Sequence, residues 1–287
     1  MKYGLSIPPF EDHADPIVLA SLAKVAEDAG WDGFFVWDHI LFRKTPIAVA
    51  DPWIALAAIA VATERITIGP MVTPVPRRRP WVLARQCVTL DQLSNGRLIL
   101  GVGIGAPVEQ EFAAFGEVTD TATRAEMLDE GLDLMARLWS GKQIKEDGKH
   151  YHLKGVGFLP TPVQQPRIPI WVGGSWPNKG PMRRAARWDG VMPFKVGGKM
   201  TAKDVGTISE YITSQRVIDT PFDFVMSGAT PGDDRPAGAA IVSKWESAGA
   251  TWWVEDVSMW RFGVRRSNAP WPTEQIAERI AQGPPRV

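Results

Sequence analysis

Two adjacent residues, Asp38 and His39, bring a carboxylate and an imidazole together directly after the apolar run at residues 34–37. Imidazole titrates near neutral pH, so His39 is a candidate proton donor or acceptor, and Asp38 could fix which ring nitrogen carries the proton. Four large apolar residues in a row predict a strand covered on both faces, as in a parallel sheet. Active sites of βα barrels are built at the carboxyl ends of such strands. The pair is therefore a candidate catalytic site, and a turn cap beside a structural histidine is the alternative.

A second candidate is the stretch at residues 173–180, which carries Ser175, Asn178 and Lys179 and precedes Pro181. Proline suits the first turn of a helix, so a helix is expected to begin there. Hydroxyl, amide and ammonium groups next to the free N–H groups of a helix amino terminus suit a phosphate. The stretch predicts a phosphate site, and an ordinary strand-to-helix loop is the alternative.

Three glycines stand in the sequence Gly101-Val102-Gly103-Ile104-Gly105. A dinucleotide fingerprint needs a third glycine at a spacing that this stretch lacks. We therefore interpret the glycines as positions where a ligand ring lies close to the backbone.

Eight apolar runs, each followed by a helical pattern, organise the chain. This alternation predicts one α/β domain over residues 1–287, an eight-stranded parallel βα (TIM) barrel with insertions. The predicted strands are residues 3–7, 34–37, 66–72, 98–100, 168–172, 191–194, 222–226 and 251–254.

Local signals mark where several helices begin. Asp15-Pro16 and Asp51-Pro52 are start signals, and capping boxes are expected at Thr123-x-x-Glu126 and Thr201-x-x-Asp204. Residues 141–169 are broken by Gly and Pro, and a short hairpin around residues 151–153 is expected within them.

The composition excludes several classes of function. Lys and Arg together number 32, as do Asp and Glu, so no broad electropositive surface for nucleic acid is expected. The one basic run, Arg77-Arg78-Arg79, is interpreted as a solvated loop. Cys87 is the only cysteine, and the chain has neither a membrane-length apolar segment nor a signal-peptide pattern. A cytoplasmic protein with no membrane partner is expected.

With these motifs in view, the chain resembles the luciferase-like flavin-dependent oxidoreductases, which include enzymes that use coenzyme F-420 (F420), a deazaflavin. The resemblance spans nearly the whole chain and rests on a set of motifs in order. They are residues 29–33, Trp37-Asp38-His39, 65–69, 89–97, Gly101-Val102-Gly103-Ile104-Gly105, 160–164 and 169–174.

The resemblance implies a barrel whose flavin-type cofactor lies at the carboxyl ends of the strands, with His39 beside its redox centre. It also implies a non-prolyl cis peptide near Met71-Val72, and a cofactor phosphate at residues 173–180. An acid on the first loop is implied as well, and Glu11 and Asp12 both stand near that position. The expected cofactor contacts are Met71, Val72, Thr73, Gly103, Glu109, Gly173, Gly174, Ser175, Trp176, Asn178, Lys179 and Gly180.

Two activities follow from the resemblance. The first is a monooxygenase that uses reduced FMN on a small organic substrate, with a flavin reductase as supplier of the reduced cofactor. The alternative is an F420-dependent dehydrogenase or reductase with His39 as acid or base. Arg43 stands where some relatives carry a tryptophan, so the substrate cannot be assigned by analogy.

Two other classes of protein are alternatives: a non-enzymatic flavin-binding barrel and a metal-dependent hydrolase. For the hydrolase, His150-x-His152 is the one chelating pattern among four histidines. It lies in the broken segment rather than at a strand end, and no metal site is expected.

Tryptophan is unusually common, with 13 residues in the chain. Several stand in the carboxyl-terminal third, which predicts apolar surface for a partner and hence a homodimer. They are Trp245, Trp252, Trp253, Trp260 and Trp271.

Overall fold

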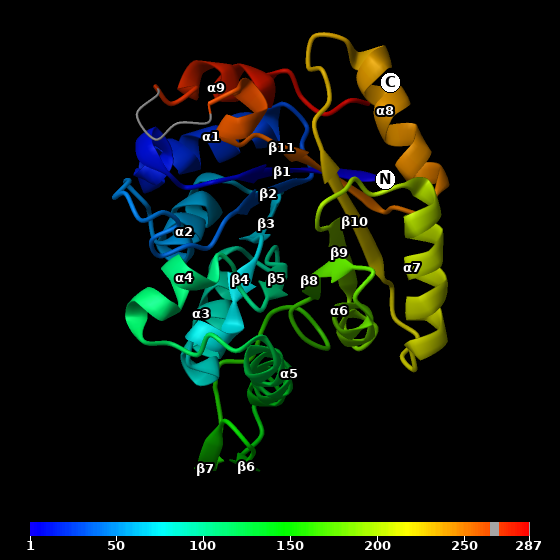
Figure 1. Ribbon diagram of the computed structural model, residues 1–287. Coiled ribbons are helices and arrows are strands. Elements are labelled where there is room, and N and C mark those ends of the chain that lie inside the picture. Colours follow the sequence, from blue (N-terminus) through cyan, green and yellow to red (C-terminus); the bar gives the residue numbers. More distant parts are fainter. Residues whose placement is uncertain (265–269, 287) are drawn as a thin grey trace.

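A parallel sheet curved into a barrel and surrounded by helices forms the centre of the molecule (Figure 1). The computed structural model describes residues 1–264 and 270–286. The sheet order is β3-β2-β1-β11-β10-β9-β8-β5-β4, and every pairing within it is parallel. The barrel strands are β1 (Lys2–Ile7), β2 (Gly33–Val36), β3 (Thr67–Pro70), β4 (Thr73–Pro74), β5 (Leu100–Gly103), β8 (Ile170–Trp176), β9 (Gly190–Lys195), β10 (Asp223–Gly228) and β11 (Trp252–Asp256).

β3 and β4 are two parts of one barrel strand, interrupted at a cis peptide between Met71 and Val72. β3 pairs with β2, whereas β4 pairs with β5 through Thr73 and Val102. A bridge between Ile68 and Leu98 links β3 to the chain just before β5, so the ring of strands closes there. The predicted barrel is confirmed, and its third strand is divided at the residues where the cis bond was expected.

The helices follow the strands and cover the outside of the sheet (Figure 1). The α-helices are α1 (Pro16–Asp28), α2 (Pro52–Ala62), α3 (Pro80–Leu93), α4 (Val108–Glu111), α5 (Thr121–Leu138), α6 (Lys179–Ala185), α7 (Ala202–Gln215), α8 (Arg235–Ser247) and α9 (Thr273–Ala281). Short 3₁₀ helices are η1 (Glu11–Ala14), η2 (Val75–Arg77), η3 (Ala113–Phe115) and η4 (Met259–Phe262).

Three of the four predicted capping signals are confirmed. Asp15 and Asp51 accept backbone N–H groups at the starts of α1 and α2, and Thr201 forms a capping box with Asp204. The box at Thr123 is wrong, because α5 begins earlier and its cap is Asp120. The Asp120 carboxylate accepts both the N–H and the hydroxyl of Thr123, so Thr123 lies inside the first turn.

Strand side chains divide between two apolar layers. Phe34 and Val36 pack outward with the helices, whereas Phe35 points into the barrel and packs with Trp171 and Trp252. Of the five carboxyl-terminal tryptophans, Trp245, Trp252 and Trp253 are buried in these layers. Those three offer no surface to a partner, whereas Trp260 is 41% exposed and Trp271 is half-buried. The predicted homodimer stays a prediction.

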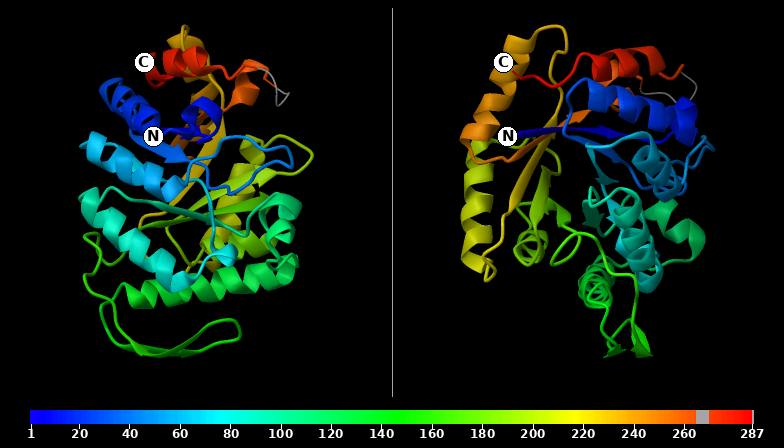
Figure 2. Two further views of the ribbon diagram at one scale, coloured as in Figure 1. Left: turned by 90° about the vertical axis from the view of Figure 1, so that its left-hand side faces the viewer. Right: turned by 180° about the vertical axis from the view of Figure 1, so that it is seen from behind.

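The expected hairpin is confirmed. β6 (Ile144–Asp147) and β7 (His152–Val156) are antiparallel and lie alongside α5, at one edge of the molecule (Figure 2). Glu130 of α5 accepts the backbone N–H groups of His150 and Tyr151, which ties the hairpin turn to the helix. Within the described residues, no helix combines the length and the apolar character needed to cross a bilayer.

Candidate functional site

Asp38 and His39 stand just beyond the carboxyl end of β2, at the barrel rim, as predicted. Asp38 is buried, whereas the His39 side chain keeps 15% of its surface exposed. The imidazole packs against the rings of Phe10, Trp37 and Phe42, whose centroids lie 5.7, 6.1 and 4.9 Å from its own. His39 is therefore held by aromatic contacts while part of its ring remains open to a ligand.

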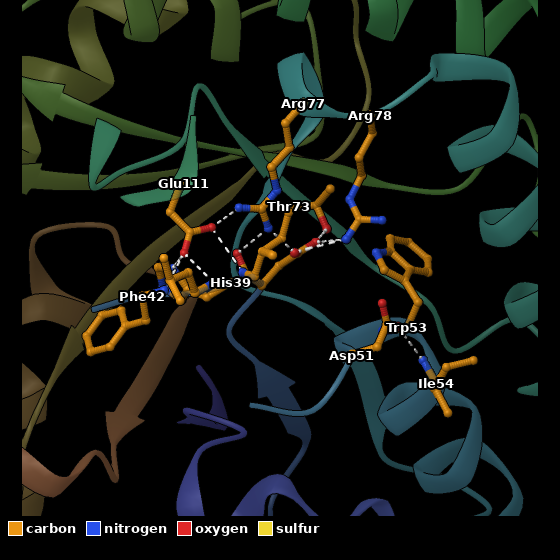
Figure 3. Close-up of polar contacts among 12 residues, drawn as sticks. His39, Phe42, Asp51, Trp53, Ile54, Thr73, Arg77, Arg78 and Glu111 are labelled. Atoms are coloured by element: carbon orange, nitrogen blue, oxygen red, sulfur yellow. Dashed lines mark hydrogen bonds and ion pairs between the residues drawn. The ribbon is translucent and has the colours of Figure 1, made fainter. Parts of the chain in front are cut away.

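The carboxylate that reaches His39 belongs to Glu111, at the end of α4 (Figure 3). One Glu111 oxygen, Oε1, lies 3.2 Å from His39 Nδ1. The same carboxylate accepts the backbone N–H groups of Ile40, Leu41 and Phe42 at 3.1, 3.2 and 2.7 Å. Burial raises the pKa of Glu111, but the contacts from His39, Phe42 and Ile40 outweigh it and lower the pKa to about 2. Glu111 is therefore a carboxylate across the physiological pH range.

Two arginines complete the site, so the interpretation of residues 77–79 as a solvated loop is wrong for Arg77 and Arg78, whereas Arg79 is exposed. The Arg77 side chain is 2% exposed and forms ion pairs with both Glu111 and Asp38. Its Nη2 also donates to the Asp38 carbonyl at 2.9 Å. Arg78 Nη2 donates to both Asp38 carboxylate oxygens, at 2.9 and 3.0 Å. Burying two carboxylates here is possible because two guanidinium groups accompany them.

Asp38 does not have the expected role of fixing the His39 tautomer. Its carboxylate is taken up by Arg77, Arg78 and the Thr73 hydroxyl, which donates at 2.7 Å. Thr73, expected among the cofactor contacts, is fully buried in this interaction. The acidic partner of His39 Nδ1 is Glu111.

Sequence reasoning missed Glu111 and the arginines because their contacts join three different strand ends. The local signal for Glu111 was a glutamate beside Phe112 just after the glycines of β5. Glu109, which was predicted instead, lies two residues earlier on α4 and is exposed. A two-residue offset on so short a helix moves a side chain to a different face.

The first-loop acids lie on η1. Asp12 is exposed and accepts a hydrogen bond from the Thr273 hydroxyl of α9. Glu11 is half-buried, and its backbone has a φ of 51°. Among described residues, neither carboxylate contacts His39.

The Met71–Val72 peptide is cis, as the resemblance implied. A Cβ placed on Gly103 would lie 3.0 Å from Val72 Cγ2, and one on Gly173 would lie 3.3 Å from Val72 Cγ1. Gly103 therefore makes room for Val72, which is itself an expected cofactor contact. The interpretation of Gly103 as a position where a ligand ring lies close to the backbone stays a prediction.

Residues 173–180 are not the flexible loop that was predicted. β8 continues through Gly173, Gly174, Ser175 and Trp176, because these residues pair in register with β9. α6 begins at Lys179, two residues before Pro181, since proline is tolerated anywhere in the first turn.

The expected phosphate ligands therefore stand at a tight strand-to-helix junction. Asn178 caps α6 by accepting the Gly180 N–H at 3.1 Å. Lys179 lies over the Tyr211 ring at 5.3 Å, and Ser175 is half-buried at the end of β8. Polar groups remain at this rim position, although fewer backbone N–H groups are free than a long loop would offer.

The histidines of the hairpin do not chelate together. His150 Nε2 lies 3.1 Å from Glu126, and His152 Nδ1 lies 2.9 Å from Asp147. Across residues 1–264 and 270–286, no group of three or more His, Cys, Asp or Glu side chains is arranged to hold a metal ion.

The sequence matches a known family and a characterised enzyme. A sequence model of the luciferase-like monooxygenase family matches residues 1–229. An F420-dependent glucose-6-phosphate dehydrogenase from Gordonia bronchialis is 34% identical over 170 residues, which are 57% of this chain and 48% of that protein. The match thus spans about half the length of that curated relative.

Two solved structures share the fold. The coenzyme F420-dependent tetrahydromethanopterin reductase from Methanopyrus kandleri has a TM-score of 0.74 at 18% identity, with 98% of this chain and 97% of that one covered. A monooxygenase from Streptomyces bottropensis has a TM-score of 0.72 at 21% identity, covering 98% and 96%. At these identities the likeness concerns the fold alone.

Proposed function

Since this chain belongs to the luciferase-like monooxygenase family, we propose that it is an F420-dependent oxidoreductase with His39 as its acid–base residue. The observation that carries the choice of cofactor is the 34% identity with an F420-dependent glucose-6-phosphate dehydrogenase. The FMN-dependent monooxygenase, which was expected first, has support from the description of the family and from monooxygenase structures that share the fold. We propose that the enzyme works in the cytoplasm on a small molecule.

The described residues fit a planar ring at the rim. Met71 and Met192 are half-buried and pack on the aromatic layer inside the barrel, and Val72 is half-buried beside them. In this apolar floor, Met71 and Val72 directly follow the end of β3, and Met192 lies within β9. Barrels of this kind bind ligands at the carboxyl ends of strands. A partly exposed imidazole at the same rim suits a ligand whose reacting edge exchanges a proton.

When bound, the deazaflavin supplies hydride transfer, and the chain supplies orientation and proton transfer. Glu111 holds the Nδ1 side of His39, which leaves Nε2 for the substrate. In alcohol oxidation His39 Nε2 removes the hydroxyl proton as hydride leaves the carbon, and in reduction it returns that proton. The apolar floor and the rings around His39 exclude water from this exchange.

The cofactor choice is tested by adding F420 or FMN to purified protein and following visible absorbance. We expect F420 to bind and to be reduced with glucose 6-phosphate or a panel of small alcohols. Oxygen consumption with reduced FMN, and no turnover with F420, would establish the monooxygenase instead. Only in that case is a flavin reductase partner required.

We also propose that Ser175, Asn178 and Lys179 hold the cofactor phosphate. Their support is their position together at the β8–α6 junction. Charge-assisted hydrogen bonds contribute about 1.5–3 kcal/mol each, so Ser175→Val should weaken F420 binding by roughly 10-fold or more. The same change should leave affinity for the ring without its phosphate unaltered. Equal losses for both ligands in a fluorescence titration would contradict the assignment.

A homodimer is proposed as well, on a different surface from the one expected. Every residue of α2 is apolar, yet Ile54 and Val61 are 64% and 73% exposed. Beside them on α1, Ile17 is 69% exposed. A helix that is apolar all round is normally buried on both sides, so a second copy is proposed to cover this face.

Light scattering tests the dimer. Val61→Glu should yield a monomer mass at micromolar concentration, because it places a charge in the proposed interface. Val217→Glu is the matched control, since Val217 is 97% exposed at a distant position after α7. A wild-type monomer, or dimers from both variants, would contradict the proposal.

A further inference from the structure

Glu111 contacts an imidazole with one carboxylate oxygen and a guanidinium with the other (Figure 3). We propose that Glu111 and Arg77 are positioning residues that act on the protonation of His39 with opposite signs. Glu111 fixes the proton on Nδ1 and favours the imidazolium, whereas Arg77 moderates that effect by pairing with Glu111. The inference rests on the proposed function only for its effect on turnover.

The tautomer follows from the partners of Glu111. Its carboxylate accepts three consecutive backbone N–H groups and an arginine N–H, and it has no proton to offer. His39 Nδ1 is buried, and Glu111 Oε1 lies 3.2 Å from it in an ion-pair contact that lacks the alignment of a hydrogen bond. So close an approach of a carboxylate oxygen is favourable only when Nδ1 carries hydrogen. Neutral His39 therefore carries its lone pair on Nε2. The acid–base atom of the site is then fixed before any ligand arrives.

The opposite signs follow from charge and burial. Glu111 is fully buried, so its negative charge acts on His39 through little solvent and stabilises the protonated ring. Arg77, whose side chain is 2% exposed, cancels part of that charge. Without Arg77, the full charge of Glu111 would act on His39.

The remaining charges around His39 are balanced. Asp38, on the same loop, is paired with Arg77 and Arg78, and the three aromatic rings that pack around the imidazole are uncharged. The next charged residues along those loops are Glu11, which follows Phe10, and Arg43, whose guanidinium lies 5.4 Å from the Phe42 ring. Among described residues, Glu111 is therefore the charged side chain that contacts the His39 ring, and Arg77 pairs with Glu111.

The experiment is nitrogen NMR of the unligated protein with labelled histidine rings. With four histidines in the chain, His39→Gln assigns the His39 signals by their disappearance. We expect wild-type His39 in its neutral form to carry hydrogen on Nδ1. Hydrogen on Nε2 would overturn the inference, and this measurement needs no variant of the network.

Variants then test the signs. Glu111→Gln should move the titration midpoint of His39 to lower pH by about one unit, the effect of losing a neighbouring charge. Arg77→Met should move it to higher pH, and the double variant should fall between the two. Shifts of the same sign, or no shift in folded protein, would overturn the inference.

Matched controls come from a second buried ion pair, Glu255 with Arg261. Glu255→Gln and Arg261→Met remove the same groups without touching His39, so they should leave its titration unchanged. The NMR titration of His39 needs neither cofactor nor substrate. It therefore tests the inference even if the protein shows no F420-dependent activity. If the activity holds, the pH dependence of turnover should move with the NMR midpoints.

Discussion

Two buried charge clusters stand at the carboxyl ends of barrel strands, and they do different things. The His39 cluster consists of Asp38, His39, Arg77, Arg78 and Glu111. The Glu255 cluster consists of Thr230, Glu255, Arg261 and Arg279. Glu255 lies near the carboxyl end of β11, and Thr230 follows β10. Each is built round a glutamate with no exposed surface that pairs with arginine.

The difference lies in what each glutamate holds. Glu255 accepts the N–H and hydroxyl of Thr230 at 2.7 and 2.9 Å and the Trp253 indole at 2.8 Å. Its arginines come from η4 and α9, so the cluster fastens the last elements of the chain to the barrel. Glu111, by contrast, holds a partly exposed imidazole. Buried charges at the end of a barrel strand are therefore not enough to indicate an active site. The feature that distinguishes the His39 cluster is a titratable side chain that is partly exposed.

Replacing His39 should give the largest difference in effect on turnover between the two clusters. His39→Asn should lower turnover by about 10²–10⁴-fold, the range for losing a general acid or base, while stability and cofactor affinity stay close to wild type. Steady-state rates and fluorescence titration measure these quantities. An unchanged rate with a true substrate would remove the functional distinction between the clusters.

Truncating the other cluster should affect stability instead. Glu255→Ala leaves two buried arginines without their partner, which costs about 3–5 kcal/mol in the free energy of unfolding. Turnover per folded molecule should not change. Urea denaturation and rates at low temperature separate the effects, and a catalytic loss in fully folded protein would show that the Glu255 cluster belongs to the active site.

Acid provides a test specific to Glu111. Its pKa is lowered from 4.5 to about 2 in the folded protein, so ionised Glu111 contributes stability above pH 4.5. That contribution is lost as the pH falls from about 4.5 to about 2, because the unfolded chain takes up the proton first. Glu111→Gln should therefore show a shallower loss of unfolding free energy in this window. Equal slopes for wild type and variant would contradict the ionic role of Glu111.

The smallest expected effect concerns the amino terminus of α2, which lies next to Arg78 of the His39 cluster. Asp51 caps α2 through the N–H groups of Trp53 and Ile54, and the Arg78 guanidinium lies 6.0 Å from the Trp53 ring (Figure 3). Asp51→Ala should cost about 1 kcal/mol of unfolding free energy, the usual value for an N-cap. The matched change Asp120→Ala removes a cap far from Arg78. A loss of turnover with Asp51→Ala alone would extend the His39 cluster to α2.

The sequence predicted correctly those features that are determined by residues close together in the chain. Apolar runs and caps such as Asp15, Asp51 and Thr201 predicted the alternation of strands and helices. The position of His39 after an apolar run placed it at the rim, and the resemblance placed the cis peptide at Met71–Val72. These features depend on residues within a few positions of one another.

What was missed depends on contacts between distant segments. Arg77 and Arg78 read as solvated because their partners, Asp38 and Glu111, lie more than thirty positions away. The close approach of Gly103 to Val72 joins two strands, so neither strand shows it in sequence. Glu109 and Glu111 offer the same chemistry in sequence, and only the fold decides which one is buried.

All members of the His39 cluster come from residues 38–111, whereas the proposed phosphate ligands come from residues 175–179. The rim segments after β1, β10 and β11 contribute no charged member to the His39 cluster within the described residues. One continuous stretch of the chain thus carries the His39 cluster, and the proposed phosphate ligands lie outside it. Substitutions at residues 175–179 therefore change the proposed phosphate contacts without replacing any member of the His39 cluster.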